Sequence, residues 1–294
     1  MTARERRQSI DLMRFVAAFG IVWAHMQAPG MIEGYVALGL FVVLTGFLSL
    51  RSLARGGARR FWLGRLLRFA LPWVVWVALY RLLDVVRAQD VTLLWTVTDP
   101  WWLLIGPAVH LWFLPFVVVF SPVVIVGLAA VRSARGVWLA AAACLPLALG
   151  AVWLHDAGTL PQPLVQWAFA LTPLLYGILS ALGHHYRAVA APLVFVAAAG
   201  GIAGLGWGSV AAPFMLSAAL LFEAFWRADL RWPAATALGR LAFGIYLIHP
   251  AAMLVWFKLG GAALPAQAGA VAVFALSALA TVVMRQVPVG RWLT

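Results

Sequence analysis

The chain has 294 residues, of which 65% are hydrophobic and only 10% are charged, and its mean hydropathy is +0.97. Soluble globular domains are about 45–50% apolar, so this composition excludes an ordinary soluble protein and indicates an integral membrane protein. The formal net charge is +12. Because the basic residues are dispersed among the ends of apolar runs and do not gather on a polar face, we expect no nucleic-acid partner.

Ten apolar runs follow one another along the chain, each near the roughly 20 residues that a helix needs to cross a bilayer. None alternates as membrane strands do, and the breaks between them are short and rich in Gly, Pro and Arg. We therefore predict an all-α fold, a polytopic transmembrane bundle of about ten helices in a single membrane domain over residues 1–294. The predicted helices span 10–29, 35–53, 66–85, 109–131, 137–154, 163–183, 189–207, 209–226, 238–257 and 268–286.

The basic residues predict the orientation of this bundle. If the N-terminus is cytoplasmic, only Arg81, Arg87 and Lys258 of the 21 Lys and Arg residues fall on the outer side. This bias places both termini in the cytoplasm and favours an even number of crossings. The first run follows "MTARERR" as in a signal peptide, but Asp11 and Arg14 interrupt it and no small-residue cleavage pattern follows, so we expect it to be retained.

Tryptophan and cysteine carry structural information. The segment "LLWTVTDPWWLLIG", between the third and fourth runs, is typical of an interfacial aromatic belt or of a segment folded back against the outer surface. Cys144 is the one cysteine, so we predict neither a disulfide nor a thiolate metal cluster, and no metal site.

Two polar residues interrupt the first run, "RFVAAFGIVWAH". Arg14 and His25 are eleven residues apart, which at about 100° per residue puts both side chains on one face of a helix, separated by roughly 16 Å along its axis. Charged and ionisable groups inside membranes are costly and tend to be functional. The alternatives are that Arg14 is a snorkelling anchor paired with Asp11 and that His25 makes a helix-to-helix hydrogen bond.

Further polar residues lie in three other runs. Arg65 and Arg68 are three residues apart at the cytoplasmic start of the third predicted helix, where two guanidiniums can hold a phosphate, although their spacing alone favours a plain positive-inside signal. His110 lies near the outer end of the fourth run, and Tyr246 and His249 form an i,i+3 pair in the ninth. These polar residues predict arginines in the inner half and histidines in the outer half of one site.

Several ordered motifs resemble the membrane-bound acyltransferase 3 family. "IDLMRFVAAFGIVWAH" is similar to its opening signature, "GLFVVLTGFL" to its second-helix segment, "RLLR" to its Arg-x-x-Arg element, "HLWFL" to its next element, and "FGIYLIH" to its late Tyr-Leu-x-His element. The set spans nearly the whole chain. Thr45, Val42 and Ala242 depart from residues common in the family, Ser, Phe and Ser respectively, which puts in doubt a direct role for these three positions.

The resemblance implies an enzyme that moves an acyl group, typically acetyl, from acyl-coenzyme A to a hydroxyl of an envelope glycan, a glycolipid or a glycosylated natural product. It makes His25 the catalytic histidine, Arg14 its partner, and Arg65 and Arg68 the donor-site arginines. The partners expected are acyl-CoA as co-substrate, a carbohydrate or glycosylated acceptor, and the lipid bilayer, with no permanently bound cofactor. The expected location is the bacterial inner membrane.

An alcohol needs a base to attack a thioester, and a histidine suits that role. His25 either takes the acceptor's proton directly or is itself acylated first. Tyr246 and His110 are the candidates for stabilising the oxyanion, and His249 is expected to shape the site. The alternative class is a transporter or flippase of a glycan or anionic substrate, which also uses membrane arginines and histidines, but the paired, interrupted helices of two related halves are missing from this sequence.

Overall fold

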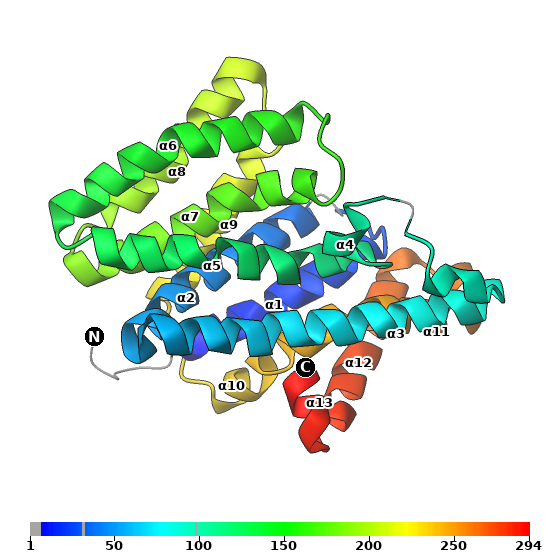
Figure 1. Cartoon of the computed structure of the whole chain (residues 1–294). Helices are drawn as coiled ribbons and strands as arrows, with labels where there is room; N and C mark the ends of the chain where they lie inside the picture. Colours follow the sequence, from blue (N-terminus) through cyan, green and yellow to red (C-terminus); the bar gives the residue numbers. More distant parts are fainter. Residues whose placement is uncertain (1–6, 31–32, 98) are drawn as a thin grey trace.

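The computed structural model describes residues 7–30, 33–97 and 99–294, and these residues form helices joined by short connections (Figure 1). The longer helices are α1 (Gln8–His25), α2 (Glu33–Arg65), α3 (Leu71–Ala88), α5 (Phe113–Ala130), α6 (Ala134–Asp156), α7 (Leu164–Tyr186), α8 (Ala190–Trp207), α9 (Ala212–Arg227), α11 (Ala242–Lys258) and α12 (Ala266–Met284). The shorter ones are η1 (Leu66–Ala70), η2 (Val91–Leu94), α4 (Trp102–Ile105), η3 (Val109–Trp112), α10 (Pro233–Gly239), η4 (Gly261–Ala263) and α13 (Pro288–Leu293). The predicted all-α class is confirmed.

Six of these helical stretches are long and apolar enough to cross a bilayer, or seven if α10 and α11, which meet at a 50° bend, form one span. One stretch, Gly34–Ala88, has 55 residues, which at 1.5 Å per residue is about 80 Å and far exceeds a hydrocarbon core of about 30 Å. Gly57 breaks it with non-helical angles, φ 72° and ψ 167°. The count of ten crossings and the cytoplasmic termini stay predictions.

Every predicted run contains a helix, but several boundaries differ. α1 ends at His25, four residues before the predicted end, because the chain turns through Gln27 and Gly30 with positive φ. The helix that begins α2 breaks at Gly57, four residues after the predicted end at residue 53, and helix resumes beyond Gly57, well before the predicted start at residue 66, since the Ala, Arg and Leu residues there favour helix. The predicted helix 238–257 begins only at Ala242, because the short α10 precedes it.

The N-terminal half of α2 forms the centre of the bundle. Helix α2 packs against α1, α5, α7 and α9, while α6 and α8 cover α7 on the outside (Figure 1). In the apolar stretch of α7 that could cross the bilayer, 72% of the residues are buried inside the protein, whereas the corresponding share is 28% in α6 and in α12. Helices α6 and α12 therefore present most of their surface outward, to the lipid.

The crossing of α2 and α7 brings two backbones together. A Cβ built on Gly177 would lie 2.1 Å from the carbonyl oxygen of Val43, and one built on Gly46 would lie 2.5 Å from that of Leu174. Glycines at such positions let membrane helices approach closely. This contact fixes the position of the central helix.

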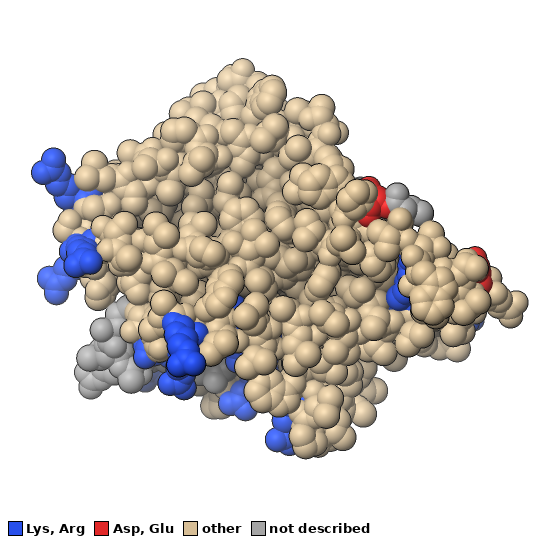
Figure 2. Space-filling view, viewed as in Figure 1, with Lys and Arg blue, Asp and Glu red and all other residues tan. Residues whose placement is uncertain are grey.

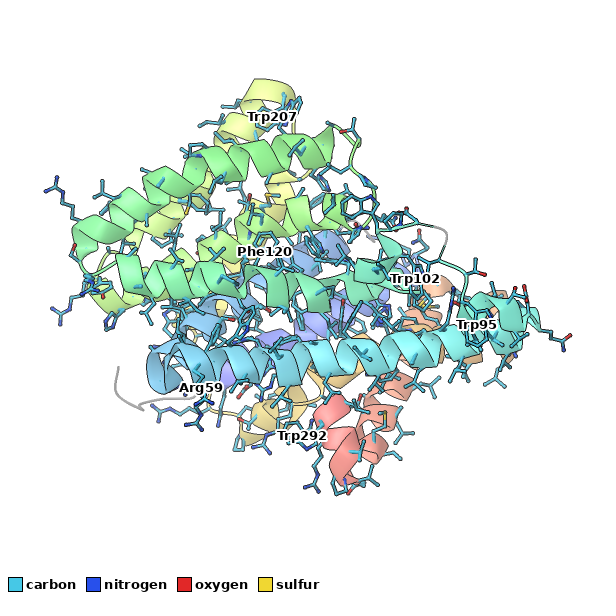
Figure 3. The ribbon with its side chains drawn as sticks, viewed as in Figure 1. Arg59, Trp95, Trp102, Phe120, Trp207 and Trp292 are labelled. Carbon is cyan, nitrogen blue, oxygen red and sulfur yellow. The ribbon has the colours of Figure 1, made fainter. Side chains whose placement is uncertain are left out.

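The tryptophan-rich segment folds back on α3. The Arg81 guanidinium lies 4.8 Å from the Trp102 ring and donates a hydrogen bond to the carbonyl of Thr96. A Cβ on Gly106 would lie 2.6 Å from a methyl of Val77. The segment therefore folds back against the protein, one of the two arrangements expected for it, and Trp95 is exposed at its edge (Figure 3).

Lys and Arg are unevenly distributed over the surface. In Figure 2 the blue atoms lie mainly at the left end of the bundle, where α2 turns and α6 begins, and along the lower edge near α13. The red acidic atoms lie at the opposite, right-hand end. This asymmetry agrees with the basic bias from which the orientation was predicted.

Candidate active site

Three histidines predicted to act together lie in one cluster. The ring centroids of His25 and His249 are 4.9 Å apart, and those of His249 and His110 are 5.1 Å apart. His25 is the last residue of α1, His110 lies in η3, and His249 lies in α11. The packing of α11 against α1 brings the first and last of these together.

The three histidines differ in their access to solvent or substrate. His25 is exposed, whereas His110 is 3% exposed and His249 is fully buried. The Nδ1 atom of His25 lies 2.8 Å from the carbonyl oxygen of Ile21. Since a carbonyl oxygen only accepts, Nδ1 carries the proton and Nε2 carries the lone pair. His25 is therefore the one member of the cluster that combines access with a basic nitrogen.

His249 and His110 are the buried members of the cluster. The Nδ1 atom of His249 donates to the carbonyl oxygen of Tyr246 over 2.7 Å. The Nε2 atoms of His249 and of His110 are both buried and have no hydrogen-bond partner within the described part of the chain. A buried polar atom without a partner costs free energy, so these two nitrogens are available to a ligand or a water molecule.

Two tyrosines fix the backbone around these buried histidines by hydrogen bonds. The hydroxyl of Tyr246 donates to the carbonyl oxygen of His110, and the hydroxyl of Tyr80 donates to that of Leu247 over 2.7 Å. The Tyr80 ring also lies 5.3 Å from the His110 ring, edge to face. Tyr80 was not singled out in the sequence, because a tyrosine in an apolar helix gives no sign of which neighbour it will meet.

The predicted donor-site arginines lie at the C-terminal end of α2 and in the turn that follows it. Arg65 ends α2 and is half-buried, with its guanidinium 4.7 Å from the Phe61 ring and 5.3 Å from the Phe69 ring. Arg68 lies in the π-helical turn η1 and is exposed. Their i,i+3 spacing predicted a shared face, but the π turn gives the two guanidiniums different environments.

A column of aromatic rings connects these arginines with the histidines. Phe69 packs 6.5 Å from Phe113, Phe113 lies 5.7 Å from Tyr246, and Tyr246 lies 6.1 Å from His249. Phe41 stacks on Tyr246 at 5.7 Å. The column therefore links Arg65 with the histidine cluster through one continuous core.

Arg14 is half-buried on α1, three turns before His25, as its spacing predicted.

Three positions depart from the family pattern. Val42 and Ala242 are fully buried, and the hydroxyl of Thr45 donates to the carbonyl of Phe41 on its own helix. Among the residues with described positions, no group of three or more His, Cys, Asp or Glu has the arrangement of a metal site.

Long apolar helices around a core with histidines and arginines define this molecule as an integral membrane protein with an enzyme-like polar site. A sequence model of the acyltransferase 3 family, described as an acyltransferase domain, matches residues 7–285. The chain belongs to this family, and it is a membrane acyltransferase. No curated protein and no solved structure matches the chain.

Proposed function

We propose that this acyltransferase uses acyl-CoA, with acetyl as the acyl group, and transfers it to a hydroxyl of an envelope glycan, a glycolipid or a glycosylated natural product in the bacterial inner membrane. The observation that carries the proposal is the exposed His25, with its Nε2 lone pair free, seated on the buried histidines of α11 and η3. No other histidine combines these features in the described ranges 7–30, 33–97 and 99–294.

The chemistry follows from the state of His25. Its Nε2 takes the proton of the acceptor hydroxyl while the oxygen attacks the thioester carbon. The new C–O bond forms as the C–S bond breaks, and the proton passes from His25 to the departing thiolate. In the alternative route, Nε2 attacks first and an acyl-histidine transfers its acyl group to the hydroxyl. Trapping labelled acyl-protein from labelled donor distinguishes the two routes.

The donor is expected to bind at the arginine end of the core. Arg68 is exposed and the half-buried Arg65 lies three residues before it, so their guanidiniums can bind the donor's phosphates by charge-assisted hydrogen bonds. The acyl arm then extends past Arg14 and the aromatic column toward His25. Binding of the phosphates at a fixed distance from the histidine positions the thioester for attack.

The negative charge that develops on the thioester carbonyl oxygen needs a hydrogen-bond donor to stabilise it. The Tyr246 proton is already used on the His110 carbonyl, whereas the His110 Nε2 has no partner among the described residues. The His110 ring donates to the Leu247 carbonyl, so its unpartnered Nε2 carries a lone pair, and either candidate must release its present carbonyl before it can donate to the oxyanion. Tyr246 and His110 therefore both stay candidates for this role.

The test uses protein purified in nanodiscs and acetyl-CoA, with release of free CoA as the readout. We expect the parent to release CoA and His25→Ala to lose about 10²–10⁴-fold of that activity with an unchanged melting temperature. His185→Ala is the matched control, since His185 is exposed at the far end of α7. Unchanged release by His25→Ala would exclude the assignment of His25. A parent that neither binds nor cleaves any acyl-CoA would favour transport instead.

A further inference from the structure

A second cluster of charged and aromatic residues lies away from the histidines, around Trp226 near the end of α9. The Arg7 guanidinium lies 4.3 Å from the Trp226 ring, and that of Arg51 lies 5.5 Å from it. Arg51 also lies 5.7 Å from the Phe47 ring. Side chains from the start of α1, from α2 and from α9 thus converge on one indole.

The ring of His184, near the end of α7, lies 4.8 Å from the Trp226 ring. Its Nε2 atom is buried and has no hydrogen-bond partner within the described residues. The charge of Glu223 and the opposite charges of Arg7, Arg51 and Arg227 all act on this imidazole. Four helices therefore contribute polar groups to one place.

The charges in this cluster do not balance. Glu223 is the one carboxylate that the described residues place there, and it is already engaged: it accepts from the hydroxyl of Tyr176 over 3.0 Å and from Arg227 over 3.2 Å. Arg7 and Arg51 repel each other electrostatically, and Arg55 adds to this repulsion. Within residues 7–30, 33–97 and 99–294, two guanidiniums are thus held together with no carboxylate assigned to them.

Positive-inside anchoring is the simplest alternative, but it explains the cluster poorly. Anchoring arginines extend separately toward water or lipid headgroups, whereas Arg7 and Arg51 both lie against one ring, and Arg7 is fixed by a hydrogen bond to the Trp226 carbonyl. A guanidinium stacked on an aromatic ring keeps its N–H edge for a ligand. Convergent guanidinium edges are the usual way in which proteins bind phosphate.

We propose that Arg7, Arg51 and Trp226 form a phosphate-binding site at the inner end of α1, α2 and α9, with His184 as an additional donor. Arg65 and Arg68, whose aromatic contacts are Phe61 and Phe69, are not part of it. The ligand is a phosphate ester, which comes either from the nucleotide part of the donor or from an anionic lipid headgroup. The site does not depend on the role of His25, so either proposal can fail alone.

Two probes distinguish the two sources. The first is radiolabelled adenosine 3′,5′-bisphosphate, measured by equilibrium dialysis against protein in phosphatidylcholine nanodiscs. The second is phosphatidylglycerol, measured as the lipid retained when protein is purified from mixed phosphatidylglycerol and phosphatidylcholine micelles. Arg51→Gln and Arg7→Gln are compared with Arg59→Gln, because Arg59 is an exposed arginine at the same end of the bundle (Figure 3). Two independent variants keep the test valid if one of them does not fold.

We expect Arg51→Gln and Arg7→Gln to weaken binding of one probe about tenfold or more, and Arg59→Gln to change it less than twofold. Weaker binding of the bisphosphate by these variants identifies the donor nucleotide as the ligand. Weaker retention of phosphatidylglycerol identifies a lipid headgroup as the ligand. If both probes bind the folded variants as they bind the parent, or if Arg59→Gln weakens binding equally, the site does not exist as proposed.

Discussion

The imidazole rings of His25 and His249 lie 4.9 Å apart, although one ends the first helix and the other lies in α11. The exposed His25 therefore rests on a fully buried ring whose own Nδ1 is fixed by the Tyr246 carbonyl. A histidine so supported is restricted to few orientations, which is what a general base requires.

His249→Phe tests this support. Phenylalanine keeps a ring in the space but removes the hydrogen bond to Tyr246 and the buried Nε2. We expect kcat to fall about 10–100-fold while KM for acetyl-CoA stays unchanged, because the donor arginines are elsewhere. Steady-state kinetics in nanodiscs measure both constants, with His185→Phe as the control. Parent-like kcat would mean that His249 only fills space.

Tyr246→Phe and Tyr80→Phe test the two hydrogen bonds that tie α11 to η3 and to α3. Each variant loses one hydroxyl donor from a buried carbonyl. Side-chain hydrogen bonds in membrane bundles contribute about 0.6 kcal/mol on average and up to about 1.7, so we expect a small loss of unfolding free energy in both. Only Tyr246→Phe is expected to lower CoA release as well, since it frees the His110 backbone.

Unfolding in mixed micelles and CoA release give the two readouts for these variants. Tyr35→Phe is the matched control, because Tyr35 is 49% exposed. Equal stability of Tyr35→Phe and Tyr246→Phe would show that the hydroxyl bond to His110 contributes nothing measurable.

The comparison of sequence and structure shows what a single sequence can predict here. Apolar runs of about 20 residues place the helices, because a bilayer admits few other structures. The i,i+3 spacing places Tyr246 and His249 on one face, but the meeting of His25 with His249 depends on how α1 packs against α11, which no local pattern encodes. Tyr80 was missed for the same reason, because its role is set by a tertiary neighbour. The break at Gly57, by contrast, falls within the predicted interruption between residues 53 and 66.

Arg68→Gln tests the donor site. Arg68 is exposed in the π turn η1, so its removal leaves the packing intact. We expect KM for acetyl-CoA to rise about tenfold with kcat nearly unchanged, because a lost phosphate contact weakens binding of the ground state and the transition state alike. Arg60→Gln is the control, because Arg60 is an exposed arginine in the preceding helix α2. A fall in kcat without a change in KM would place Arg68 at the chemical step instead.

Gly177→Ala tests the contact on which the central helix depends. The added Cβ would lie 2.1 Å from the Val43 carbonyl oxygen and 3.0 Å from the Phe47 nitrogen, and both are backbone atoms that cannot rotate away. Helices α2 and α7 must therefore separate, and we expect a loss of about 1–3 kcal/mol or more in unfolding free energy. Gly201→Ala is the matched control, since nothing lies within 4 Å of its Cβ and alanine favours helix. Unfolding of both variants in the same micelles gives the comparison. If Gly177→Ala were as stable as Gly201→Ala, the backbones of α2 and α7 would lie farther apart than the structure places them.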